Sequence, residues 1–158
     1  MFLLQPRFLL PTAAAFGFLG LAIFVVAGRD FAFDTRLVML FRDAADPSTP
    51  LGPAWFREMM RDVTALGSFV ALGTMTVVAA LTLRLCGHWR LALGLIVTVL
   101  SGVAASTLLK IAIGRERPDI VEHAALTFTA SFPSGHAFLS AVVLLGIAGF
   151  VGIASRPA

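Results

Sequence analysis

Long apolar stretches alternate with shorter polar ones along this chain of 158 residues. Four of the apolar stretches approach or exceed the ~20 residues that an α-helix needs to cross the hydrocarbon core of a bilayer. They predict spanning helices at about Phe8 to Ala27, Val63 to Leu85, Leu91 to Ile113, and His136 to Ala154. The expected fold class is therefore all-α, an integral membrane helical bundle in a single domain over residues 1–158.

A different pattern marks the polar connection between the first two predicted spans. Prolines and a glycine interrupt residues 47–53, and apolar residues then recur at helical spacing opposite charged ones. The apolar set is Trp55, Phe56, Met59, Met60, Val63 and Leu66, and the charged set is Arg57, Glu58, Arg61 and Asp62. This pattern predicts an interfacial amphipathic helix that aims the second span. A lid or lipid-entry ramp is the alternative interpretation.

Composition agrees with a membrane protein, because 58% of the residues are hydrophobic and only 13% are charged. Three segments carry basic residues and no acidic ones: the start of the chain, the link between the second and third spans, and the end of the fourth span. Their basic and histidine residues are Arg7, Arg84, His88, Arg90 and Arg156. By the positive-inside rule these segments face the cytoplasm, and the acidic connections face the periplasm or exterior.

This charge distribution also bears on partners and localisation. The basic excess lies beside apolar spans, so we expect membrane lipids as partners and no nucleic acid. The expected location is a membrane, and specifically a bacterial inner (plasma) membrane.

One candidate chemical motif lies at the outer end of the third span. Lys110 precedes Arg117 by seven positions, which is two helical turns if the helix persists that far, and Pro118 then ends the helix. An arginine fork and a lysine point charge together suit a phosphate. Each residue taken alone is more simply an interface anchor.

The second motif, Pro133-Ser134-Gly135-His136, opens the fourth span. Ser134 is predicted to cap the helix and offer its hydroxyl, and Gly135 lets a backbone N–H approach a ligand. A helix N-terminus attracts anions, and His136 is suited to general acid or base catalysis near neutral pH. Combined with Lys110 and Arg117, this stretch predicts a phosphate site rather than a plain helix start.

These motifs resemble those of the type 2 phosphatidic acid phosphatase family, membrane lipid phosphatases that share their catalytic fold with vanadium haloperoxidases and glucose-6-phosphatase. The family's first motif is a Lys, six residues and Arg-Pro, and its second is Pro-Ser-Gly-His. The resemblance implies that Lys110, Arg117, Ser134 and Gly135 bind phosphate and that His136 protonates the leaving oxygen. It also implies a metal-independent reaction, so we expect no cofactor and no metal.

The family's third motif supplies the nucleophilic histidine, and it does not occur within the 158 residues. Ser155-Arg156 resembles its first two residues, but about 30 Å of helix separates that pair from His136. His123 occupies no motif position, and His88 is predicted on the cytoplasmic side. Because family members usually have six membrane helices, we expect an N-terminal part of such a domain, incomplete at the C-terminus and inactive alone.

The function expected from the resemblance is that of a membrane lipid phosphate or pyrophosphate phosphatase. Such an enzyme hydrolyses phosphoric monoesters or anhydrides through a phosphohistidine. Phosphatidate-like lipids, phosphatidylglycerophosphate and polyprenyl pyrophosphates all fit this description. The alternative is a noncatalytic membrane protein that binds anionic lipid headgroups or a partner membrane chain.

Overall fold

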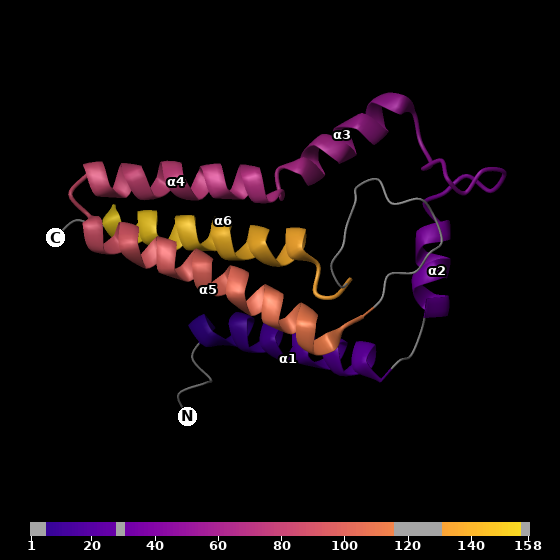
Figure 1. Ribbon diagram of the computed structural model, residues 1–158, viewed down its shortest axis with the longest axis horizontal. Helices are drawn as coiled ribbons and strands as arrows, with labels where there is room; N and C mark the ends of the chain where they lie inside the picture. Colours follow the sequence, from indigo (N-terminus) through magenta and orange to yellow (C-terminus); the bar gives the residue numbers. More distant parts are fainter. Residues whose placement is uncertain (1–5, 28–30, 116–130, 156–158) are drawn as a thin grey trace. The chain divides into compact units, whose positions relative to one another are not determined.

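A computed structural model describes residues 6–27, 31–115 and 131–155, and every regular element in these ranges is an α-helix (Figure 1). The all-α prediction is confirmed for these ranges. The helices are α1 (Pro6–Val26), α2 (Phe31–Met39), α3 (Ala54–Ala65), α4 (Phe69–Leu85), α5 (Trp89–Ile113) and α6 (Gly135–Ala154). They fall into two compact units, one containing α1 and α2 and the other containing α3 to α6.

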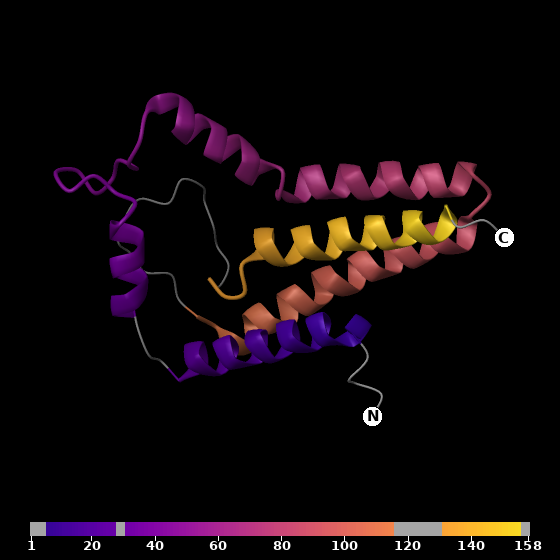
Figure 2. The same cartoon turned by 180° about the vertical axis from the view of Figure 1, so that it is seen from behind.

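In the second unit α5 packs against both α4 and α6, and α4 also packs against α6. Figure 2 shows these three helices side by side, with α4 and α6 beginning at the end where α5 finishes. Buried apolar side chains fill the contact in two clusters. One contains Ala80, Leu83, Ala92 and Leu95, and the other contains Leu72, Leu139 and Val143.

Glycines on α5 allow α6 to come close. A Cβ added at Gly102 would lie 2.7 Å from Cγ1 of Val142, and one added at Gly94 would lie 2.8 Å from Cε1 of Phe150. Both distances are too short for carbon atoms that are not bonded, so the missing side chains are what admits the facing residues. Small residues at such contacts let membrane helices approach closely.

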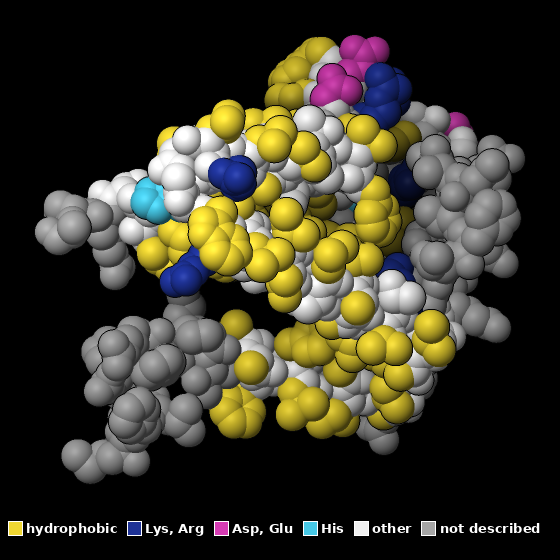
Figure 3. All heavy atoms as spheres, turned by 60° about the vertical axis from the view of Figure 1, so that its left-hand side comes forward, with side chains coloured by type: hydrophobic (Ala, Val, Ile, Leu, Met, Phe, Trp, Pro, Cys, Tyr) yellow, Lys and Arg dark blue, Asp and Glu magenta, His cyan; other side chains and the backbone are white. Residues whose placement is uncertain are grey.

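Two helices, α5 and α6, are long and apolar enough to cross a membrane. The pair α3 and α4 passes the same test as one span bent by 51°, and within the 21 residues of α1 the segment Ala13–Val26 is a shorter apolar helix. The described residues thus provide two or three spans by length and composition, where the sequence predicted four. Figure 3 shows hydrophobic side chains over most of the visible helix surface, as expected for a membrane protein.

The start of the second predicted span was misplaced. The apolar pattern suggested a helix from Val63, but α3 ends at Ala65 and α4 begins at Phe69. Ser68 caps α4, because its Oγ accepts a hydrogen bond of 3.2 Å from the backbone N of Ala71. A serine cap preceded by a glycine starts a new helix although the residues on both sides are apolar.

The predicted amphipathic helix is present as α3. None of its residues is buried, and Trp55 is 65% exposed on its apolar side. Its charged side is anchored to the preceding loop, where Arg57 Nη1 donates a 3.3 Å hydrogen bond to the carbonyl oxygen of Pro50. The location of α3 on a membrane surface stays a prediction.

Substituting Gly102 by alanine should test the close contact between α5 and α6. The new methyl collides with Val142, a β-branched side chain that has little rotamer freedom in a helix, so the helices must separate. We expect a loss of about 1–3 kcal/mol in the free energy of unfolding, measured by titration with a denaturing detergent.

The pair Gly102→Ala and Val142→Ala should be less destabilised than the sum of its single variants, because removing Val142 makes room for the new methyl. Gly149→Ala on α6 is the control, since nothing lies within 4 Å of a Cβ at that position. An unchanged stability of Gly102→Ala would contradict the packing described above.

Candidate functional site

Lys110 lies in the last turn of α5, as predicted, and is partly buried. The helix ends at Ile113, because Gly114 adopts the left-handed conformation at φ 59° and its N–H bonds to the carbonyl oxygen of Lys110 at 2.9 Å. The predicted end of this span at Ile113 is confirmed, and the helix does not persist toward Arg117. A glycine cap stops the helix before Pro118 can, so the spacing of seven residues does not set the two cations on one helix face.

Arg117 and Pro118 lie outside the described residues, but the described chain on either side of them is joined. The carbonyl oxygen of Arg115 accepts two hydrogen bonds from Ser131, one of 2.9 Å from the backbone N and one of 3.1 Å from Oγ. These bonds hold the residues that follow α5 against those that precede α6. The two motif-bearing segments thus meet at one point of the second unit.

Ser134 caps α6, which confirms the prediction from the sequence. Its Oγ accepts a hydrogen bond of 3.4 Å from the backbone N of Ala137. A hydroxyl that accepts in this way keeps its proton available for donation. Ser134 is exposed, so the same side chain can stabilise the helix and donate to an anion.

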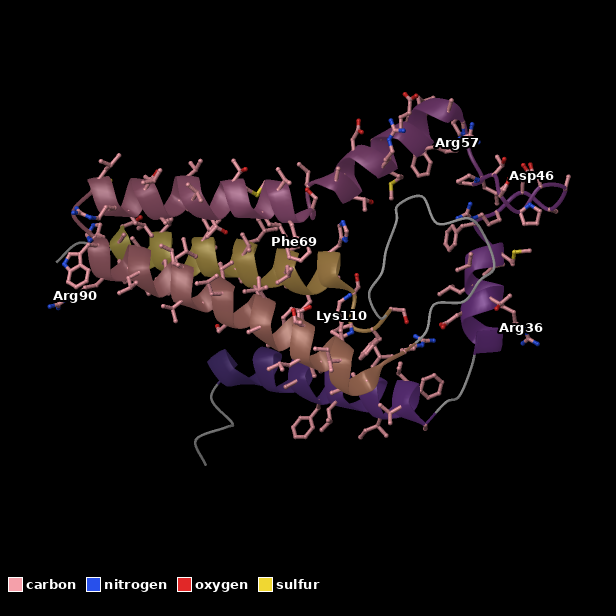
Figure 4. All side chains as sticks on the ribbon, in the orientation of Figure 1. Arg36, Asp46, Arg57, Phe69, Arg90 and Lys110 are labelled. Carbon is pink, nitrogen blue, oxygen red and sulfur yellow. The ribbon has the colours of Figure 1, made fainter. Side chains whose placement is uncertain are left out.

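The structure brings Lys110 next to Gly135, the first residue of α6. A Cβ added at Gly135 would lie 3.8 Å from Cε and 3.9 Å from Nζ of Lys110. Figure 4 labels Lys110 where the end of α5 approaches the beginning of α6. A helix N-terminus carries about half a positive charge, so a lysine beside it gathers positive potential that an anion relieves.

His136 follows Gly135 and lies against the break between α3 and α4. Its Cδ2 would be 3.3 Å from a Cβ added at Gly67. His136 is nevertheless exposed. Neither sequence motif connects Gly67 with the site. The available signal was a glycine immediately before the capping Ser68, but nothing in the sequence indicates which helix packs there.

The other residues considered from the sequence lie elsewhere or outside the description. His88 precedes α5 at the opposite end of that helix from Lys110, and Ser155 follows the 20 residues of α6. A helix of that length separates its ends by about 30 Å, so Ser155 does not approach the site. His123 and Arg156 fall outside the described residues. Among those that are described, no group of His, Cys, Asp and Glu is suited to hold a metal.

Comparison with family models finds a match over a segment of the chain that includes this site. Residues 91–157 match the PAP2 superfamily. The matched segment contains α5 from Leu91 onward, both motifs and α6, so the resemblance to the type 2 phosphatidic acid phosphatase family is confirmed. For a PAP2 segment the general class of substrate is a lipid phosphate. No curated protein and no solved structure was found to match the chain.

Substituting Gly135 by alanine should separate anion binding from folding in this PAP2 segment. The added methyl fits at ordinary contact distance but occupies the space beside the Lys110 ammonium. We expect unchanged stability and about a tenfold weaker affinity for inorganic phosphate, measured by the ³¹P linewidth in detergent micelles. Gly73→Ala on α4, with nothing within 4 Å, is the matched control. Equal affinity of both variants would contradict an anion site between Lys110 and α6.

Proposed function

We propose that this protein is a membrane lipid phosphate or pyrophosphate phosphatase that hydrolyses a phosphoric monoester or anhydride through a phosphohistidine. The observation that carries the proposal is the position of Lys110 Nζ beside Gly135 at the N-terminus of α6, within a PAP2 segment. Lysine, a capping hydroxyl and free helical N–H groups are the donors that a phosphate requires.

The proposed division of labour among these groups follows from their chemistry. Lys110 supplies a compact positive charge, Ser134 donates its hydroxyl, and the N–H of Gly135 faces the ligand without a side chain in the way. Arg117 adds a planar fork of donors by resemblance to the family's first motif. Donors fixed in this way stabilise negative charge on the equatorial oxygens of the transition state.

His136 is proposed as the general acid. A histidine nitrogen attacks phosphorus, the bond from phosphorus to the leaving oxygen breaks, and His136 gives that oxygen its proton. Water then hydrolyses the phosphohistidine to release inorganic phosphate. The attacking histidine belongs to the family's third motif and is not among the 158 residues, so we expect these residues alone to bind phosphate with slow or no turnover.

We also propose a location in a bacterial inner membrane, with the site facing the periplasm or exterior. Support comes from the basic residues at one end of the second unit. Arg84, His88 and Arg90 lie at the α4–α5 connection, the end that comes forward in Figure 3 and opposite to the end of α5 that carries Lys110. Basic residues free of acidic neighbours are typical of cytoplasmic ends.

The function is tested with protein purified from its native membrane and reconstituted in lipid vesicles. With phosphatidic acid as substrate, Lys110→Ala and His136→Ala should each lower the rate of phosphate release at least about a hundredfold, because each removes a group that acts in the transition state. Arg84→Ala, in the last turn of α4 at the other end of the unit, is the control for lost positive charge and should keep full activity.

Phosphate release that does not depend on Lys110 would contradict the proposed site. If the wild-type protein binds vesicles of anionic lipid through Lys110 without hydrolysing any lipid phosphate or pyrophosphate, the noncatalytic role in headgroup binding replaces the phosphatase.

A further inference from the structure

We propose that Gly67, in the break between α3 and α4, is a positioning residue for the imidazole of His136. The inference rests on the proposed function, in which His136 protonates the leaving oxygen. Gly67 matches no position of the two motifs, and it lies more than forty residues before the first of them. Its connection with the site comes from the three-dimensional structure alone.

Three groups converge where a Cβ of Gly67 would stand. Ser140 Oγ would be 3.0 Å away, and Cδ2 of His136 and the carbonyl oxygen of Thr64 would each be 3.3 Å away. His136 and Ser140 are one turn apart on α6, so they present the same side of that helix to the break. Thr64 belongs to the last turn of α3. The break between α3 and α4, which forms the α3–α4 corner, thus contacts the first turns of α6.

Gly67 matters because it has no side chain, and not because its backbone is unusual. Among the described glycines the positive φ angles belong to Gly52, Gly87 and Gly114, and Gly67 is not one of them. An alanine can therefore adopt the same backbone, but its methyl must displace a neighbour by a few tenths of an ångström. The Thr64 oxygen is part of the turn that ends α3 and accepts a 3.0 Å hydrogen bond from the Gly67 N–H, so the side chains of α6 have to move.

A shift of the imidazole is costly for acid catalysis in particular. Proton transfer requires the donor nitrogen within about 2.6–3.2 Å of the leaving oxygen, and a misplacement of about 1 Å can lower a rate about a hundredfold. Because His136 is exposed, the backbone at Gly67 supplies a wall on the side of the ring that faces the α3–α4 corner. The wall limits the ring positions that two side-chain torsions allow.

The test compares Gly67→Ala with Gly73→Ala, a substitution six residues further on where nothing lies within 4 Å. Each variant is assayed on an alkyl phosphate lipid and on 4-nitrophenyl phosphate, whose leaving group departs without protonation. We expect Gly67→Ala to lower the rate on the alkyl ester about ten- to hundredfold and the rate on the aryl ester less than about twofold. Gly73→Ala should leave both rates unchanged. Equal losses on the two substrates would overturn the inference, because general damage to the fold lowers both.

A second measurement does not depend on turnover. The ¹H–¹³C resonances of the His136 ring, assigned through His136→Gln, should move in Gly67→Ala and stay in place in Gly73→Ala. Ring resonances that do not move in Gly67→Ala would overturn the inference even if the protein is an active phosphatase. If the wild-type protein has no activity but the ring resonances move in Gly67→Ala, the proposed function is refuted and the contact between Gly67 and His136 still stands.

The variant Gly67→Ala combined with Ser140→Ala removes the shortest of the new contacts, the one to Oγ. It should be at least as thermally stable as Gly67→Ala while keeping the selective loss on the alkyl ester, because the methyl still presses on His136. Full recovery of the rate on the alkyl ester would assign the effect to Ser140 and overturn the role proposed for Gly67.

Discussion

The contact between α5 and α6 determines where every described part of the site lies. In lipid, helices associate through close packing rather than through the hydrophobic effect, so small residues decide which faces meet. Gly94 admits Phe150 and Gly102 admits Val142, and one further step of eight residues along α5 leads to Lys110 beside Gly135. As the sequence numbers of these α5 residues rise, the sequence numbers of the α6 residues that face them fall. The two helices are therefore antiparallel. The end of α5 therefore meets the beginning of α6.

That arrangement brings like charges together. The ammonium of Lys110 is favoured by the C-terminus of its own helix, where the carbonyl groups carry partial negative charge. The partial positive charge at the neighbouring N-terminus of α6 disfavours the ammonium, and packing of the two helices over several turns keeps the two groups close together. Proteins commonly concentrate such unfavourable local arrangements at functional sites, where a ligand relieves them. In the proposed function that ligand is a phosphate.

The sequence predicted well those features that depend on one segment at a time. The long apolar runs gave α5 and α6 nearly to the residue, and Ser134 was recognised as a cap because its role depends only on the next three residues. Errors arose where two local signals competed. The apolar pattern ran through Gly67 and Ser68 although the cap starts a new helix there, and the seven-residue spacing to Arg117 suggested a shared helix face although Gly114 ends the helix.

Features that depend on two segments were not predictable from these residues. Gly94 and Gly102 indicate a close approach of some helix, but they do not say that Val142 and Phe150 supply the partner surface. For the same reason the contact between His136 and the α3–α4 corner was missed. The roles of Lys110, Ser134, Gly135 and His136 follow from resemblance and chemistry, whereas their neighbourhood follows from packing.

The two hydrogen bonds from Ser131 to the Arg115 carbonyl oxygen have a consequence for how this family segment can vary. They close the chain on itself immediately after α5 and immediately before α6, so the site inherits its geometry from the helices and from this closure. The distance between Lys110 and Gly135 does not depend on the number of residues inside the closure, and lengthening a closed loop costs little entropy. Insertions after the first motif are thus compatible with an unchanged distance between Lys110 and Gly135, so that part of the interval can diverge in length without moving these two residues.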